Sequence, residues 1–472
     1  MTSMFNARLT ALAAAALLAG CSMMPTYERP AAPVAVGWPA AAPTAGTPAT
    51  ELQWQAFFPD ERLKQLVAIA LQNNSDLRVA VLNIEQARGQ YDIRRADRFP
   101  TVNAAAAGTR SPTASGVDVS LYTAGIAVSS WEIDLFGRVA SLSEAALAQY
   151  LASEEGRKAV QMSLVANVAN VWLSLVADDE LLKLTQETLA TRQESLRLTR
   201  LRFENGVASE LDSRQAQSLY ESARVSLAVQ ERQRALDRNA LALLLGGPLP
   251  ADFLVTATTD SISLPDVPAG VPSEVLVRRP DVRQAEQQLI SANANIGAAR
   301  AAFFPRITLT AGYGSASTDL SNLFTGGTWG LTAAPQLLLP IFDAGRNRAG
   351  LASAEAGRDI AVAQYEKAIQ SAFREVADGL AARTTLVDQQ QALRNVVEAE
   401  SARLRLSQLR YDGGVSSYLE LLDAQRTLFN ARQLEIQTRL ARLQNQVLLY
   451  RALGGGWETP SDQQQAVQLR TP

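Results

Sequence analysis

Hydrophobic and polar positions alternate in two short stretches of the chain, and this pattern predicts β-strands. Apolar residues at 307, 309, 311 and 313 are separated by Thr and Gly, and residues 122–128 show a similar alternation. A period of two places the apolar side chains on one face of an extended strand. Segments rich in Gly, Ser, Thr and Asp, at 109–120 and 315–328, are expected to be hairpin loops. Two hairpins, each with two strands, are therefore predicted.

Most of the remaining sequence has helical periodicity, in runs that are longer than ordinary globular helices. The stretch 138–203 contains no proline, and at about 1.5 Å per residue it would form a helix roughly 100 Å long. It breaks at Gly206, where glycine permits a left-handed backbone, and resumes as a second helix of about 35 residues. A matching run follows Arg346 and breaks at Gly414. Two long helical hairpins are expected.

The hairpin tips reveal an internal repeat. The segment 201–209, LRFENGVAS, recurs at 409–417 as LRYDGGVSS, and the same offset of 208 relates Gly137 to Gly345. Further matches follow in the same order along most of the chain, which chance does not produce. The sequence therefore predicts two copies of one structural unit.

A shorter helix precedes the strands in each copy. It is expected over 75–98 and over 281–303, and in both copies a Phe-Pro pair ends it. Each copy thus has the order helix, two strands, very long helix, tight tip and shorter helix.

Composition argues against catalysis. The chain has no histidine, and its 47 acidic and 44 basic residues are interleaved along helical faces. A His general base, a Ser-His dyad and a His metal ligand are excluded, and no Gly-rich loop is followed by the Lys-Ser/Thr that phosphate binding needs. A net charge of −3 gives no electrostatic basis for binding nucleic acid. We expect no enzymatic activity, no cofactor, no metal site and no nucleic-acid partner.

The N-terminus is similar to a bacterial lipoprotein signal. An apolar run over 9–19, shorter than the ~20 residues of a membrane-spanning helix, is followed by Gly20 and then Cys21, the single cysteine of the chain. In such signals cleavage leaves the cysteine first, and its thiol and amine are acylated, with palmitate among the expected acyl chains. Ser22 stands where an Asp would retain the protein in the inner membrane, so the outer membrane is favoured. The alternative is a buried hydrophobic cysteine.

The strands can cross a membrane only in a closed barrel. After the signal we expect no apolar stretch of 18 or more residues, so a crossing must use strands. Four strands leave open edges, which cost several kcal/mol per unpaired group in lipid. Two chains would give eight strands and a nearly filled interior, whereas three give twelve and a water-filled lumen, so a homotrimer is expected. The alternative is a soluble helical protein with a minor sheet, because Pro335 and Pro340 weaken the fourth strand.

Together, the lipoprotein signal, the doubled unit, the two tips, the helix LLDAQRTLFNAR and the closing LGGGW resemble the TolC/OprM-type outer-membrane efflux channels, in particular the lipidated OprM-like branch. The resemblance covers residues 21–457. It implies a mainly α fold with a small transmembrane β-barrel: a trimeric 12-strand barrel in the outer membrane, continued by a periplasmic α-helical barrel. The implied partners are outer-membrane lipid, a periplasmic adaptor (membrane fusion) protein and an inner-membrane pump of the RND type.

This interpretation divides the chain into six segments. They are a signal peptide (1–20), a lipidated proline-rich tether (21–60), a first structural repeat (61–250), an equatorial linker (251–275), a second structural repeat (276–457) and a C-terminal tail (458–472).

The resemblance also assigns candidate site residues. The adaptor-docking tips match Gly206, Val207, Ala208, Ser209, Gly414, Val415, Ser416 and Ser417, and the residues that close the channel match Tyr411, Leu419, Asp423 and Arg426. Asp423 and Arg426 are three apart on one helix face and can bond to each other or across protomers, while Leu419, repeated threefold, could form an apolar constriction. The alternative is an ordinary helix pair. The first repeat has Phe203, Leu211, Gln215 and Ser218 at the corresponding positions, so the charged pair is expected in the second copy alone.

The expected function is that of a passive exit duct in a tripartite efflux system. It would receive drugs or other small amphiphilic compounds from the pump through the adaptor. An exit duct for metal ions or for secreted protein, or a non-conducting structural lipoprotein of the envelope, remain as alternatives. An enzyme such as a carboxylate-based hydrolase would need a concentrated acidic cluster, which the sequence lacks.

Overall fold

The computed structural model of the protein describes residues 22–39, 47–112, 118–250 and 257–457. Cys21, the signal peptide and the C-terminal tail lie outside the described residues. The chain divides into two compact units, and each takes parts from both repeats. The units are Met1–Ala32 with Val81–Glu155 and Arg283–Ala368, and Pro33–Ala80 with Gly156–Val282 and Ile369–Pro472.

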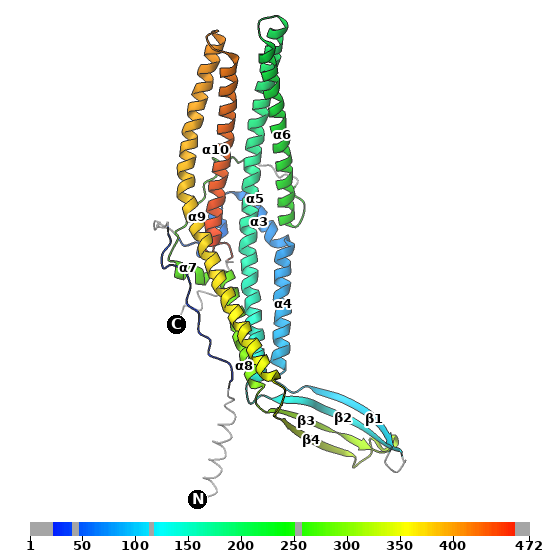
Figure 1. The fold of residues 1–472 in the computed structure, drawn as a ribbon. Coiled ribbons are helices and arrows are strands. Elements are labelled where there is room, and N and C mark those ends of the chain that lie inside the picture. Colours follow the sequence, from blue (N-terminus) through cyan, green and yellow to red (C-terminus); the bar gives the residue numbers. More distant parts are fainter. Residues whose placement is uncertain (1–21, 40–46, 113–117, 251–256, 458–472) are drawn as a thin grey trace. The chain divides into compact units, whose positions relative to one another are not determined.

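The first unit contains a four-stranded antiparallel sheet in the order β1-β2-β3-β4 (Figure 1). The strands are β1 (Val102–Pro112), β2 (Asp118–Ile133), β3 (Arg306–Ser317) and β4 (Trp329–Leu338). β2 pairs with β3, so the hairpins of the two repeats join into one sheet. Within the described part of the chain, β1 and β4 each pair with a strand on one side only.

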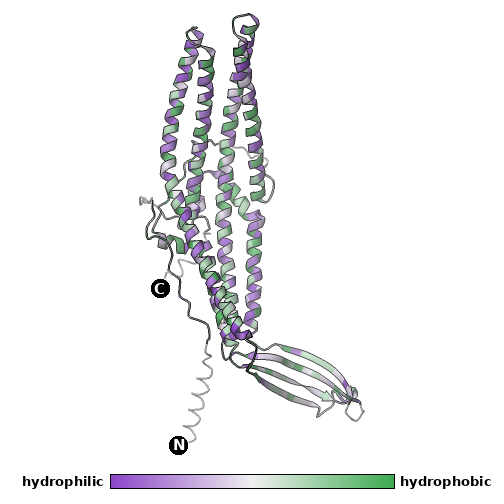
Figure 2. Cartoon of the chain, in the orientation of Figure 1, coloured by the Kyte–Doolittle hydropathy of each residue, from purple (hydrophilic) through white to green (hydrophobic). Residues whose placement is uncertain are grey.

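One face of this sheet carries apolar side chains that nothing in the unit covers. Ile126, Tyr313 and Leu331 lie opposite one another on β2, β3 and β4 and are 54%, 52% and 77% exposed. Ala333 follows Leu331 on the same face, because side chains two apart on a strand project to the same side. Figure 2 shows apolar and polar residues mixed along the strands. The row is the apolar face that the period-two pattern predicts.

The strands are longer than the sequence predicts. The expected loop over 109–120 is wrong in its bounds, because β1 runs to Pro112 and β2 begins at Asp118. The guanidinium of Arg110 and the carboxylate of Asp118 lie 2.9 Å apart and tie the two strands together at this end. In the second hairpin β3 likewise continues to Ser317, inside the expected loop over 315–328.

The fourth strand forms in spite of its proline. Pro335 pairs with Leu309 of β3, and it lies on a strand that has one partner in the described sheet, where its missing N–H can point to the open side. Pro340 lies beyond the end of β4. Proline was therefore a weaker obstacle than the sequence suggested.

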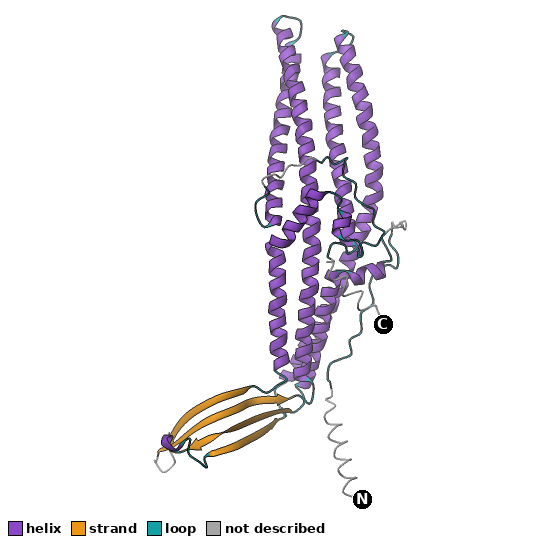
Figure 3. Cartoon of the chain, turned by 180° about the vertical axis from the view of Figure 1, so that it is seen from behind, coloured by secondary structure: helices purple, strands orange, loops and turns teal. Residues whose placement is uncertain are grey.

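The predicted helical hairpins are confirmed (Figures 1 and 3). α5 (Arg138–Glu204) and α9 (Arg346–Asp412) have 67 residues each. α6 (Glu210–Leu245) and α10 (Tyr418–Ala452) return beside them with 36 and 35 residues. Equivalent elements start at the predicted offset of 208.

An aspartate begins each long helix. The carboxylate of Asp134 accepts a hydrogen bond from the backbone N–H of Ala140 at 2.7 Å. In the second repeat Asp343 accepts one from the N–H of Asn347 at 2.9 Å. A carboxylate satisfies amides that have no partner within the first turn and is favoured by the helix dipole.

The shorter helices before the strands are α4 (Ser75–Ala96) and α8 (Pro280–Ala301), close to their predicted bounds. Four elements were not predicted: α2 (Trp54–Phe57), α3 (Glu61–Asn73), α7 (Pro272–Arg278) and the 3₁₀ helix η1 (Leu320–Asn322). Asp60 starts α3 by accepting hydrogen bonds from the N–H groups of Arg62 and Leu63, both at 2.9 Å. This N-cap signal was legible in the sequence.

The core of the second unit collects around Tyr450, near the end of α10. Its ring stacks on Phe57 with 4.0 Å between centroids, and its hydroxyl donates a hydrogen bond to the backbone oxygen of Leu52 at 2.6 Å. Trp172 of α5 and Leu245 of α6 belong to the same buried cluster. The short N-terminal helices thus complete a core that the long helices alone would leave open.

One prediction about hydrophobicity was wrong. By length and composition, the described residues contain one helix apolar enough to cross a membrane, α5, whereas the sequence analysis expected no such stretch after the signal. The apolar window of α5 is 61% buried inside the protein, and Val168, Trp172 and Val176 are core residues. Packing within the protein therefore accounts for the hydrophobicity of this helix.

Two constraints require glycine at the end of α6. Gly246 has a φ of +70°, and a Cβ at this position would lie 2.3 Å from the backbone oxygen of Asn73, the last residue of α3. Gly206, at the first tip, has a nearly identical φ of +71° but open space around it. A comparison of alanine substitutions at the two glycines therefore separates two free-energy costs. Both substitutions bear the cost of a left-handed backbone, and the one at Gly246 also bears the cost of a clash.

Gly246→Ala should lower the thermal unfolding midpoint of the detergent-purified protein more than Gly206→Ala does. Both variants bear the left-handed penalty of about 1 kcal/mol, and Gly246→Ala must in addition displace α3 from α6. Circular dichroism at helical wavelengths gives both midpoints. Equal shifts would show that the contact with Asn73 is unimportant.

Candidate functional site

The candidate residues gather where the two helical hairpins turn, in the second unit. At the first tip Gly206 adopts its left-handed conformation, and the N–H of Val207 donates to the oxygen of Arg202 at 2.8 Å. The second tip repeats this with Gly414, at φ +68°, and a 2.9 Å bond from Val415 N–H to the oxygen of Arg410.

Both tips present a valine to solvent, and they differ in how the next helix starts. Val207 is 77% exposed and Val415 is 70% exposed. At the first tip Ser209 and Asp212 form a capping box, with bonds of 3.1 Å and 3.2 Å between each side chain and the other residue's N–H. At the second tip the Ser417 side chain makes no capping bond, so this tip is less firmly closed.

Asp423 is the most connected polar side chain of the second tip. Its carboxylate accepts hydrogen bonds from Arg426, three residues on, at 2.7 Å, and from Arg403 of α9 at 2.6 Å. The hydrogen bond from Arg403 is the first cause that lowers the pKa of the Asp423 carboxyl, and Arg426 adds to it. Asp423 therefore joins both arms of the hairpin and stays ionised at neutral pH.

An aromatic pair links this hairpin to the first. The rings of Tyr411 and Tyr418 lie 5.4 Å apart. The Tyr418 hydroxyl shares a 2.6 Å hydrogen bond with Ser195 of α5, and Arg202 of α5 donates one to the Tyr411 hydroxyl at 2.5 Å. Tyr411, which the sequence analysis selected, thus contacts the opposite hairpin.

Leu419, Asp423 and Arg426 of α10 line one groove together with Gln215 and Ser218 of α6. Gln215 and Ser218 are the first-repeat counterparts of Asp423 and Arg426, so the structure brings these two pairs together. Phe203 and Leu211, the other two counterparts, do not line the groove. Leu419 is 59% exposed, so its side chain is available for a contact outside the protomer.

Sequence reasoning missed Arg403, Ser195 and Arg202. Arg403 and Asp423 are equally far along the chain from Gly413, so they face each other across an antiparallel hairpin. That symmetry about the tip could have identified the pair. Ser195 and Arg202 could not be found in this way, because their partners belong to the other hairpin.

The chain matches the family described as outer membrane efflux protein over residues 66–247 and 271–455. These stretches cover most of the chain and correspond to the two structural repeats. The protein therefore belongs to the outer membrane efflux protein family, and it is an outer-membrane channel component that extends into the periplasm.

Individual relatives are similar over nearly the whole length. The toluene efflux pump outer membrane protein TtgC of Pseudomonas putida is 48% identical over 482 residues, covering 99% of this chain and 100% of the relative. The antibiotic efflux pump outer membrane protein ArpC of Pseudomonas putida shows the same identity and coverage. The open state of the Neisseria gonorrhoeae MtrE outer membrane channel has a TM-score of 0.86 and 42% identity, covering 93% of this chain and 99% of that one.

Either of the two arginines that bind the Asp423 carboxylate should be able to hold it when the other is removed. Arg403→Gln or Arg426→Gln alone should speed hydrogen–deuterium exchange of the backbone amides at 411–417 by about twofold, because exposed ion pairs contribute at most about 1 kcal/mol. The double variant should match Asp423→Asn, with roughly fivefold faster exchange. If Arg426→Gln alone reproduced Asp423→Asn, the contact with Arg403 would carry no weight.

Proposed function

We propose that three copies of this chain form the exit duct of a tripartite efflux system, which passes solvents and amphiphilic antibiotics out through the outer membrane. The observation that carries the proposal is the four-stranded sheet with two open edges and an exposed apolar face. The duct performs no chemical reaction and requires no cofactor. The names of the relatives TtgC and ArpC support toluene-like solvents and antibiotics as the cargo.

Closure of the sheet supports the trimer. In lipid the unpaired groups of β1 and β4 must find partners, and three four-stranded sheets make a twelve-stranded barrel with a lumen. The apolar row of Ile126, Tyr313 and Leu331 then faces the acyl chains, which is the arrangement of outer-membrane barrels. Acylation of Cys21 would add a second attachment to the membrane.

The tips are the proposed docking sites for the adaptor. Residues 206–209 and 414–417 each place a solvent-exposed valine beyond the helix ends, where an apolar contact needs no rearrangement of the tip. An adaptor of this kind would hand over cargo from an inner-membrane pump of the RND type.

The second tip is the proposed gate. Asp423 and Arg426 are held by a hydrogen bond within the second hairpin, and Tyr411 is held by one to Arg202 of the first hairpin. Leu419 is exposed and can contact the Leu419 side chains of the other two protomers. An adaptor that binds the dilated tip better than the closed one would shift the equilibrium toward opening. The missing side-chain cap at Ser417 supports motion at this tip and not at the first.

Asp423→Asn should open the channel in planar bilayers. Loss of the exposed ion pairs, on the order of 1 kcal/mol per protomer, corresponds to about a fivefold shift toward opening in each protomer and to a shift of roughly 150-fold when the three open together. The wild-type bonds exist above the ordinary carboxyl pKa and are lost as pH falls through the lowered pKa of Asp423. Wild-type conductance should therefore stay flat from about pH 8 to 5 and rise only below about 3.9.

Gln215→Asn, at the first-repeat position that corresponds to Asp423, is the matched control and should leave conductance unchanged. A channel that stays silent in every variant would support a structural envelope protein and contradict the duct.

The variants Ala333→Arg and Ala334→Arg test which face of the sheet contacts lipid. The same experiment tests which compounds the channel exports. In a strain that lacks its own channel but keeps adaptor and pump, the wild-type gene should restore resistance to toluene and to amphiphilic antibiotics. Ala333→Arg places a charge on the lipid face in every copy, at up to about 2–4 kcal/mol each near the midplane, and should abolish resistance and trimers on mild-detergent gels. Ala334→Arg faces the lumen and should retain both. Equal behaviour of the two variants would refute this orientation of the sheet.

A further inference from the structure

Arg192 of α5 is a buried cation without a counter-charge. It is 5% exposed, and among the described residues its one hydrogen bond runs from Nη1 to the backbone oxygen of Leu219 at 3.1 Å. The guanidinium lies 5.1 Å from the ring centroid of Phe429. Burial lowers the pKa of Arg192, and no neighbouring charge counteracts this effect. An arginine nevertheless stays protonated, so the positive charge remains in the interior.

The other buried arginines of this unit are compensated. Arg279 is 3% exposed and contacts the carboxylates of Asp281 and Glu375 at 2.7 Å and 3.0 Å. The Arg439 side chain, 11% exposed, contacts Glu180 at 2.9 Å. Buried charges are normally paired because desolvation is costly. Arg192 departs from this rule, because no carboxylate of the described residues pairs with it. A partner from outside the chain could supply the missing negative charge.

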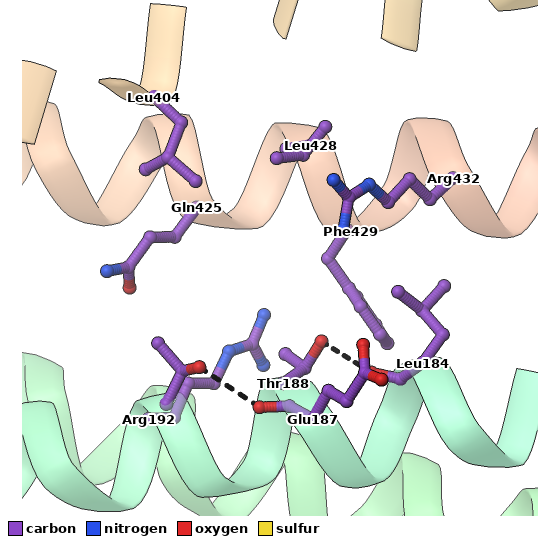
Figure 4. Close-up of a pocket in the computed structure, with 10 residues that line it drawn as sticks. Leu184, Glu187, Thr188, Arg192, Leu404, Gln425, Leu428, Phe429 and Arg432 are labelled. Atoms are coloured by element: carbon purple, nitrogen blue, oxygen red, sulfur yellow. Dashed lines mark hydrogen bonds between the residues drawn. The ribbon is translucent and has the colours of Figure 1, made fainter. Parts of the chain in front are cut away.

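A pocket between α5 and α10 lies directly beside this group (Figure 4). Gln425 extends into it from α10 and Arg192 points into it from α5, while the Arg432 side chain runs along α10 at its rim. The Gln425 side-chain oxygen and the Arg192 Nε are buried, and neither has a hydrogen-bond partner in the described part of the protein. Arg192 Nε is an unused donor, whereas the Gln425 oxygen is an unused acceptor. A half-turn of the Gln425 amide exchanges its oxygen and its NH2 group, so this side chain can also present donors to the pocket.

The charges of the lining favour an anion. Arg192 and Arg432 are cationic, and Glu187 is the one acidic residue of the lining. Leu404, Leu428 and Phe429 supply apolar walls, which reduce competition from water. Guanidinium and carboxamide N–H groups are suited to a small acceptor, and the half-open pocket offers a path from solvent.

We propose that this pocket binds a small monovalent anion at the guanidinium of Arg192, with the side-chain amide of Gln425 turned so that its NH2 group donates to the same anion. A free halide and the carboxylate of a small solute share the required chemistry. The bound anion neutralises the buried charge and bridges α5 of the first hairpin to α10 of the second. It therefore stabilises one arrangement of the two hairpins. The site does not depend on the proposed cargo or on barrel closure.

Anomalous diffraction from crystals of the purified protein soaked in bromide tests the site directly. We expect a bromide peak within hydrogen-bonding distance of the Arg192 guanidinium and the Gln425 amide. The peak should vanish in Arg192→Met, which keeps the side-chain length without the charge, and persist in Arg200→Gln, an exposed arginine on the same helix. If wild-type crystals showed no bromide peak at this position, the proposal would be overturned, and no variant would need to be measured.

Thermal unfolding in solution gives a second readout. Sulfate stabilises folded proteins in general more than bromide does, so the specific effect is a difference between variants. At constant ionic strength, replacing sulfate by bromide should lower the midpoint of the wild type and of Arg200→Gln less than that of Arg192→Met, because a ligand that binds only the folded state stabilises it. The same dependence in all three proteins would reveal a general salt effect and contradict a specific site.

Competition with acetate separates the two sources of the anion. If acetate displaces the bromide peak, the pocket accepts carboxylates of small solutes. If the peak persists at equal acetate, the site is selective for halide.

Discussion

Backbone pairing in lipid is the constraint on which the rest of the structure depends. Hydrocarbon offers no hydrogen-bond partner, so a sheet in a membrane must have no open edge. β1 and β4 leave such edges in the part of the chain that the structure describes. The proposed trimer satisfies them and at the same time creates a lumen. Oligomerisation and conduction then follow from one requirement, because the barrel that pairs the edges is also the conduit.

The two repeats have the same architecture and different tips. α5 and α9 match in length, and each starts on an aspartate cap. The first tip is held by the local capping box of Ser209 and Asp212, whereas the second is held by side-chain contacts of Asp423 with Arg403 and Arg426. A capping box forms with the helix itself, while side-chain ion pairs can exchange partners. The two copies of the unit therefore differ in the contacts that hold their tips, and the proposed gate lies at the tip that is held by ion pairs.

Polar contacts between the hairpins concentrate on α10. Tyr418 reaches Ser195, Arg439 reaches Glu180, and Arg192 lies over Phe429. Any displacement of α10 relative to α5 must therefore break or exchange several of these contacts. Ion pairs and hydrogen bonds of this kind have discrete alternatives, which makes such an interface suited to two defined states. A bound anion at Arg192 would add one more contact to that interface.

The sequence by itself determined the repeat, the four strands, the two long hairpins and the family, because these depend on period, offset and glycine positions. The resemblance to the family also selected Asp423 and Arg426, and their spacing of three residues places them on one helix face. Only the tertiary structure decided the partners of Tyr411 and Arg192. Their contacts come from different hairpin arms, and a linear pattern does not specify which faces of two helices meet. The burial of individual charges such as Arg279 and Arg192 was likewise settled by packing, because burial is a property of the assembled core.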